Sequence, residues 1–178
     1  IFTFADKQTV YDTCNFFDSL QIPWAPTWGN HDEQCYYSID WLTSCMNDLN
    51  TRRLAGLDSY CVFKDLQDDD IFGNANFVIN LINGDDVEEQ LFIFDSNRYN
   101  YGEYYGYDYI HSDQVDWYER VAHDQEYVED GQVKYIPSLA FFHIPFLEFE
   151  EAYQKIASGQ PDGCTWRKDL NGYDRDKH

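Results

Sequence analysis

Apolar residues recur at helical spacing in two segments near the start of the chain. In residues 8–20 the repeat consists of Val10, Cys14, Phe17 and Leu20. In residues 38–50 it consists of Ile39, Leu42, Met46 and Leu49. Because this spacing aligns the apolar side chains along one face, both segments are predicted to be helices that pack against a core.

Two more helices are predicted in the second half of the chain. In residues 112–124 the inner face is expected to consist of Val115, Tyr118, Val121 and Ala122. Ser112 is expected to cap this helix, because a serine hydroxyl can accept a hydrogen bond from the first helical turn. Residues 147–157 predict the last helix, which Gly159 ends. The polar residues 160–178 are expected to form a loose tail.

Short apolar runs predict strands between these helices. Residues 60–63, 74–82 and 89–95 are rich in aromatic and β-branched side chains, which favour strands. The turn-forming residues 83–86 separate the last two runs and predict a hairpin. Residues 97–110 are rich in Tyr, Gly and Asp and predict a long loop.

Two further predicted strands each run into a candidate functional residue. Pro23 and Pro26 bias the residues before them toward extended structure, so a short buried strand is expected to run into a loop at Gly29. Residues 135–145 form a nearly continuous apolar run, which predicts a strand buried on both faces. Strands that alternate with helices indicate an α/β fold, and residues 1–178 are expected to form a single domain.

Composition and charge narrow the class of protein. The chain has 178 residues, 43% of them hydrophobic, which is enough for a folded core. Its formal net charge of -21 argues against nucleic-acid binding, because phosphate backbones attract Lys and Arg. An acidic protein also repels an anionic substrate unless cations reverse the local field. No apolar run approaches the length of about 18 residues that a membrane span needs.

The five cysteines give no sign of a structural zinc site. No two of them form a C-x-x-C pair, and their odd number leaves at least one thiol unpaired within the chain. Their spacing does not determine the redox compartment, and buried free thiols are expected in preference to disulfides.

The residues that follow the two candidate strands could carry chemistry. Asn30 offers an amide oxygen, His31 a ring nitrogen, and Asp32 a carboxylate that can orient an imidazole. His143 follows the second strand, and an amide oxygen beside an imidazole suits a divalent ion such as zinc, manganese or iron. The same residues also occur in surface turns, and a histidine after a strand can be a hydrogen-bonded core residue.

The motifs at these positions resemble those of a known enzyme family. "GNHD" at 29–32 and "FFHIP" at 141–145 resemble two signatures of the calcineurin-like metallophosphoesterases, in the branch of purple acid phosphatases and secreted phosphodiesterases. "SYCVF", "GNANFVINL", "FIFDS" and "SDQVDWYE" occur between them in the order typical of that branch. The resemblance covers residues 8–156 and implies part of a metallophosphoesterase β-sandwich flanked by helices. Export or a cell-surface location is expected from the same branch.

The resemblance also implies roles for individual residues. Asn30 and His143 would bind one of two divalent or trivalent metal ions (Fe, Zn or Mn), and a metal-bound hydroxide would attack phosphorus. His31 would face the phosphoryl group and protonate the leaving oxygen or stabilise the transition state, and Asp32 would orient His31. The substrate would be a phosphate monoester or diester.

Several signatures of the family have no counterpart in this sequence. Asp-x-His and the bridging Gly-Asp are missing before Gly29, and Gly-His-x-His is missing after residue 160. "NGDD" at 83–86 lies between two predicted hairpin strands and is interpreted as a turn. The chain therefore resembles the middle of a longer enzyme. With two donors, it is expected to bind metal weakly and to lack appreciable turnover on its own.

Two alternatives use the same sequence differently. A non-catalytic acidic module could bind carbohydrate or protein through the tyrosines of its loop, which are Tyr99, Tyr101, Tyr104, Tyr105 and Tyr107. An inactive phosphoesterase relative could keep the fold without the metals. The enzyme interpretation requires the side chains of Asn30 and His143 to converge within about 3–5 Å of a common point, the reach of a shared ion.

Overall fold

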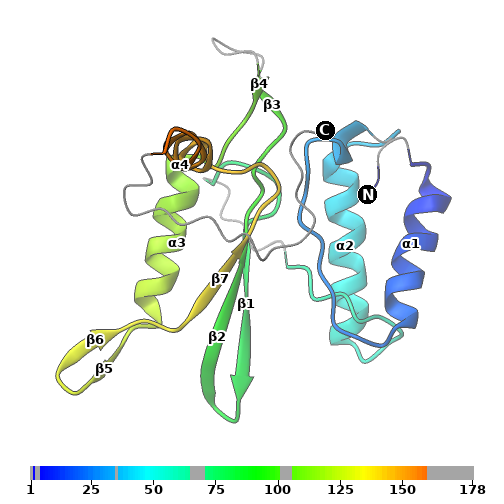
Figure 1. Ribbon diagram of the computed structural model, residues 1–178. Coiled ribbons are helices and arrows are strands. Elements are labelled where there is room, and N and C mark those ends of the chain that lie inside the picture. Colours follow the sequence, from blue (N-terminus) through cyan, green and yellow to red (C-terminus); the bar gives the residue numbers. More distant parts are fainter. Residues whose placement is uncertain (1, 3–4, 35, 65–70, 101–105, 160–178) are drawn as a thin grey trace. The chain divides into compact units, whose positions relative to one another are not determined.

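The computed structural model describes residues 2, 5–34, 36–64, 71–100 and 106–159 (Figure 1). The described helices are α1 (Lys7–Ser19), α2 (Ile39–Leu54), α3 (Ser112–Asp124), α4 (Leu147–Ala157) and the 3-10 turn η1 (Asp32–Gln34). The described strands are β1 (Phe77–Asn83), β2 (Asp86–Ile93), β3 (Tyr99–Asn100), β4 (Gly106–Tyr107), β5 (Tyr127–Glu129), β6 (Gln132–Lys134) and β7 (Ser138–Phe141). The mixed α/β class is therefore confirmed.

The chain divides into two compact units, Ile1–Ile144 and Pro145–His178. The described part of the second unit contains α4, where Gly159 follows the helix with a φ of +75°. The predicted loose tail 160–178 lies outside the described residues. No helix in the described ranges is long and apolar enough to cross a membrane.

Helices α1 and α2 pack through the apolar faces that the sequence predicts. Asp6 caps α1 by accepting a hydrogen bond from the Thr9 backbone N–H, and Ser38 caps α2 through Trp41 in the same way. The core cluster between the helices includes Val10, Cys14, Ile39, Leu42 and Met46. Both predicted helices are confirmed, and α2 extends beyond its predicted end.

The predicted hairpin is also confirmed. Strands β1 and β2 pair antiparallel and are joined at Gly84, whose φ of +66° suits a tight turn (Figure 1). Strand β7 pairs parallel with the other edge of β2, which gives the order β1-β2-β7. The "NGDD" segment is therefore a turn between strands, as interpreted from the sequence.

Three sequence-based strand predictions need correction. The segment around Trp24 and the predicted strand at 60–63 are not regular strands. They pair through a single parallel bridge between Trp24 and Cys61. Strand β7 is not buried on both faces: Leu139 is 52% exposed and Phe141 44% exposed. Among the described strands only β2 pairs with β7, so β7 is a sheet edge.

Helix α3 buries part of its predicted inner face, since Tyr118 and Val121 pack against a core cluster. Its N-cap is His111 rather than Ser112, and Val115 is 40% exposed. The buried residues are Gln114 and Trp117, the latter packed on the aromatic rings of β2 and the residues that follow it. Gln114 can be buried because its side chain is hydrogen-bonded inside the core, which removes the penalty for burying an amide.

Two small ribbons complete the first unit. Strands β3 and β4 pair within the predicted loop 97–110, and the tyrosines 101, 104 and 105 lie outside the described residues. The sequence reading missed the ribbon β5–β6, although Asp130 and Gly131 carry the signal of a two-residue turn. Both have a positive φ, as such turns require.

The cysteines in the described ranges are free thiols, as expected. Cys14 and Cys61 are buried, and Cys45 is partly buried. Burial raises the pKa of Cys14 to about 12 and that of Cys61 to about 11. These two thiols therefore stay protonated at neutral pH and act as small apolar core residues.

A buried hydrogen-bond network links α3 to the sheet and predicts the cost of disrupting it. The Gln114 amide donates to Asn76 Oδ1 and to the Asp95 carbonyl, both at 2.7 Å, and accepts from the His111 N–H. Gln114→Leu should lower the free energy of unfolding by about 2–4 kcal/mol, because each polar group left unpaired in the core costs about 1–3 kcal/mol.

Urea denaturation measures this change. Gln125→Leu, at an exposed position just after α3, is the matched control and should change stability by less than about 0.5 kcal/mol. Equal effects of the two variants would contradict the role given to the Gln114 network.

Candidate metal centre

The structure brings Asn30 and His143 together. The Nε2 atom of His143 lies 2.9 Å from Oδ1 of Asn30, although the residues are 113 positions apart in the chain. Asn30 is 4% exposed, whereas His143 is exposed, so the pair is anchored on one side and open on the other. The convergence that the enzyme interpretation requires is confirmed.

The segment that follows β2 holds the two partners in place. On one side, the Thr27 hydroxyl donates to the carbonyl of Phe94. On the other side, the fully buried Ser96 hydroxyl accepts from the backbone N–H groups of His143 and Ile144, at 3.2 and 2.8 Å. Phe94–Ser96 therefore lies between the two segments and sets the distance between them.

Gly29 allows the imidazole of His143 to approach the backbone. A Cβ atom at this position would lie 3.0 Å from both Cγ and Cδ2 of the His143 ring, closer than carbon atoms normally pack. The glycine therefore suits the close packing against the ring, which a Cβ would force to shift by a few tenths of an ångström, and its place just before Asn30 keeps the two ligand candidates in register.

The "GNHD" segment is a turn as well as one side of the site. Asp32 is buried, and its carboxylate accepts from the backbone N–H groups of Gly29 and Phe2, each at 2.9 Å. These bonds close the turn that presents Asn30. The predicted action of Asp32 on His31 stays a prediction.

His31 lies on the exposed side of the turn. Its Nδ1 is 2.8 Å from Oε1 of Gln34, an oxygen that can only accept, so this nitrogen carries the proton. In the neutral ring Nε2 then holds the lone pair, and in the protonated ring it becomes a second donor. His31 is thus oriented by Gln34 and can exchange a proton with a molecule at the site.

Tyr99 is a site residue whose role the sequence analysis missed. Its hydroxyl accepts a hydrogen bond from Nδ2 of Asn30 at 2.9 Å, and its ring lies edge-on to that of His31. The sequence places Tyr99 among several tyrosines of one loop and gives no signal that separates it from its neighbours. Pairing of β3 with β4 stacks Tyr99 on Tyr107, and this tertiary contact determines that Tyr99 is the tyrosine that reaches Asn30.

A buried carboxyl group belongs to the segment that holds the two partners, one residue before Ser96. Asp95 is 4% exposed, and burial raises its pKa above the ordinary value. Hydrogen bonds from the backbone N–H groups of Asn74 and Asn97 oppose this shift, and the carboxylates of Asp108 and Asp32 add to it. Burial and the two neighbouring carboxylates thus both disfavour ionisation of Asp95.

The side chains of Asn30 and His143 could supply two of the ligands of a metal ion. Two neighbouring ligands of an octahedral ion, each bound at about 2.1 Å, lie about 3 Å apart. The Asn30–His143 distance of 2.9 Å matches that spacing. Within the described ranges no group of at least three His, Cys, Asp or Glu side chains is placed to hold a metal. Further donors would have to come from elsewhere.

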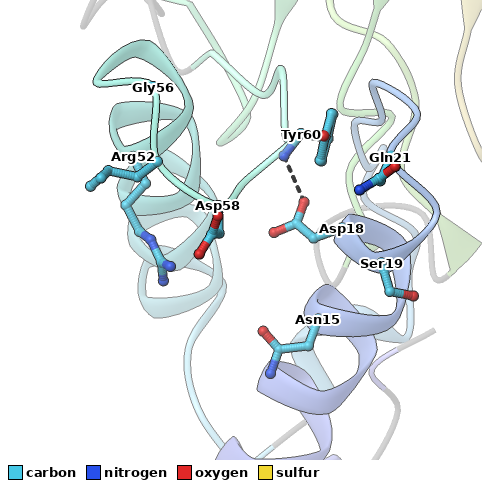
Figure 2. A pocket seen from close by; sticks show the side chains of 9 residues that line it. Asn15, Asp18, Ser19, Gln21, Arg52, Gly56, Asp58 and Tyr60 are labelled. Carbon is cyan, nitrogen blue, oxygen red and sulfur yellow. Dashed lines mark hydrogen bonds between the residues drawn. The ribbon is translucent and has the colours of Figure 1, made fainter.

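A polar cavity of about 560 Å³ is lined by other residues, most of which Figure 2 labels. Asp18, Asp58 and Arg52 are among its lining residues, and Asp18 accepts a hydrogen bond from the Tyr60 N–H. None of the candidate site residues lines it. Two carboxylates against one guanidinium make it a poor receptor for a phosphate ester.

Comparisons with known proteins point to phosphatases. The chain is 30% identical over 154 residues to phosphatase DCR2 of Saccharomyces cerevisiae, a match that covers 79% of this chain and 23% of that protein. It is 28% identical over 142 residues to "Probable inactive purple acid phosphatase 29" of Arabidopsis thaliana, covering 72% of this chain and 34% of that protein. No family model and no solved structure matches.

The chain is thus related in sequence to phosphatases at modest identity. It spans 23% of the length of the first relative and 34% of the length of the second.

Gly29→Ala tests the close approach of His143. The added methyl group must displace the ring or the backbone, which should lower the free energy of unfolding by about 1–3 kcal/mol and lengthen the Asn30–His143 contact. Urea denaturation and the NMR shifts of the His143 ring measure the two effects. Gly106→Ala is the control, because a Cβ there meets nothing within 4 Å.

The raised pKa of Asp95 predicts how stability depends on pH. A raised pKa in the folded state means that Asp95 contributes most stability when protonated, below its unfolded pKa, and loses it as pH rises through the folded pKa. The stability of wild type relative to Asp95→Asn should therefore increase as the pH is lowered from 7 to about 4. Urea denaturation at each pH measures this difference, and a decrease on acidification would contradict the prediction.

Proposed function

We propose that this chain is part of the catalytic domain of a metal-dependent phosphoric-ester hydrolase of the calcineurin-like superfamily. The observation that carries the proposal is the contact between Asn30 and His143, an amide oxygen and an imidazole nitrogen at metal-ligand spacing. The relationship to proteins named as phosphatases supports the same reaction class. The substrate is a phosphate monoester or diester.

In this proposal each residue has a defined task. Asn30 and His143 hold one cation through Oδ1 and Nε2. His143 would bind an ion through Nε2 in a form of the ring that carries no proton on this nitrogen. When bound, a pair of such ions supplies Lewis acidity and a nucleophile at neutral pH. A complete site would need further ligands besides these two.

His31 is the proton donor of the proposed site. Gln34 lies at hydrogen-bond distance from Nδ1 and His31 is exposed, so Nε2 is the nitrogen left for a substrate. A protonated His31 can donate from Nε2 to the leaving oxygen, or stabilise the charge that develops on the phosphoryl group. Asp32 acts through the turn, because its carboxylate fixes the backbone from which His31 projects.

Cations also resolve the conflict between an acidic protein and an anionic substrate. The net charge of -21 disfavours binding of a phosphate ester. Metal ions reverse the local field where the ester binds, while the surrounding carboxylates favour the ions themselves. Iron, zinc or manganese suits the mixed nitrogen and oxygen donors.

One alternative follows from the second relative, whose name describes an inactive protein. An inactive relative of this chain would keep the Asn30–His143 contact as a hydrogen bond of the fold. Metal binding and turnover in the intact protein distinguish this alternative from the proposed enzyme.

The experiment uses the protein as its gene encodes it, loaded with iron, zinc or manganese. We expect hydrolysis of p-nitrophenyl phosphate or its bis ester. His143→Ala should lower kcat/KM on the order of 100-fold or more, because even outer-shell partners of metal ligands contribute about 10–100-fold. His123→Ala, at an exposed histidine of α3, is the control and should keep full activity.

The 178-residue chain alone is the second arm of this experiment. This chain should hydrolyse neither p-nitrophenyl phosphate nor its bis ester, because its described residues offer two candidate metal ligands, Asn30 and His143. Full activity of His143→Ala, or metal-dependent turnover by the short chain, would overturn the assignment of this pair.

A further inference from the structure

The orientation of the Asn30 amide decides whether this residue can bind a cation. A carboxamide ligates through its oxygen, whereas its nitrogen is a hydrogen-bond donor. In the structure Oδ1 faces His143, and Nδ2 donates to the hydroxyl of Tyr99 at 2.9 Å. Rotation of the amide by half a turn would present the wrong group to an ion.

Water cannot easily replace the Tyr99 hydroxyl in this role. Asn30 is 4% exposed, so its Nδ2 group depends on a protein acceptor. The hydrogen bond from His143 to Oδ1 uses a proton on Nε2, whereas an Nε2 that binds an ion carries none, so this hydrogen bond and ligation exclude each other. In the ligating state the bond to Tyr99 is therefore the remaining described hydrogen bond of the Asn30 side chain.

We propose that Tyr99 is a positioning residue that holds the Asn30 amide with its oxygen toward the metal side of the site. The proposal rests on the proposed function. Electron withdrawal by a bound cation makes the amide N–H a stronger donor, so the bond to Tyr99 strengthens when the ion binds. Tyr99 thus stabilises the loaded site more than the empty one.

The surroundings of Tyr99 hold its ring at the required place. The ring stacks on Tyr107, with centroids 5.4 Å apart and an interplanar angle of 28°. It also meets His31 edge-on at 6.4 Å. Because Tyr99 and Tyr107 come from paired strands, β3–β4 positions the hydroxyl that Asn30 uses.

The matched variants are Tyr99→Phe and Tyr107→Phe. Each variant removes one hydroxyl and keeps the stacked ring. In the described structure Asn30 donates to the hydroxyl of Tyr99, so Tyr99→Phe removes this acceptor and Tyr107→Phe keeps it. Tyr107 is 62% exposed, so loss of its hydroxyl exposes no buried donor. A difference between the variants therefore reports the hydrogen bond rather than ring packing.

Binding of Mn²⁺ alone to the intact protein, followed by electron paramagnetic resonance, is the test. Tyr99→Phe should weaken binding of one ion by about 10-fold, as expected for loss of an outer-shell partner, and Tyr107→Phe should not change it. In the metal-free protein, Tyr99→Phe should also shift the side-chain amide NMR signals of Asn30. Thermal unfolding confirms that both variants stay folded.

Three results would overturn the inference. If wild type binds no Mn²⁺, the proposed function fails and the inference fails with it. If wild type and both variants bind equally, the inference fails while the proposed function stands. If the two variants lose affinity equally, the tyrosine rings rather than the Tyr99 hydroxyl support the site, which also rejects the inference.

Discussion

The hydrogen bond between Asn30 and His143 depends on a third segment that neither residue belongs to. Ser96 is fully buried, and its hydroxyl accepts two backbone N–H groups at the end of β7. Thr27 binds the Phe94 carbonyl from the other side. The extended residues after β2 therefore connect both halves of the site, and changes in them should act on the candidate ligands without contacting a metal.

The same segment begins the buried polar network. Asp95 receives backbone N–H groups through its carboxylate, and its own carbonyl accepts from Gln114. Burying so many polar groups costs free energy unless each has a partner, and a fully paired network favours one arrangement over others. We infer that the network fixes the geometry of the turn after β2. A purely apolar core would allow this turn to shift relative to its neighbours. The raised pKa of Asp95 is a consequence of this burial.

The sequence predicts the helices better than the strand contacts. Helical spacing and caps are local, so α1, α2 and the β1–β2 hairpin follow from nearby residues. Pairing of Trp24 with Cys61 depends on residues far apart, and the apolar run of β7 cannot reveal that only β2 pairs with it among the described strands. At the site, the motif predicts Asn30 and His143. It cannot predict Tyr99, whose contact with Asn30 spans 69 positions.

A hydrogen-bonded core histidine and a metal-binding histidine differ in what surrounds them. For a purely structural contact, close packing and shelter from water on both sides would be advantageous. Here Asn30 is buried and fixed by Tyr99, whereas His143 is exposed and its ring rests on a glycine. One partner is rigid and the other accessible, which suits a pair that must admit an ion from solvent. That asymmetry favours a metal-binding role over a structural one.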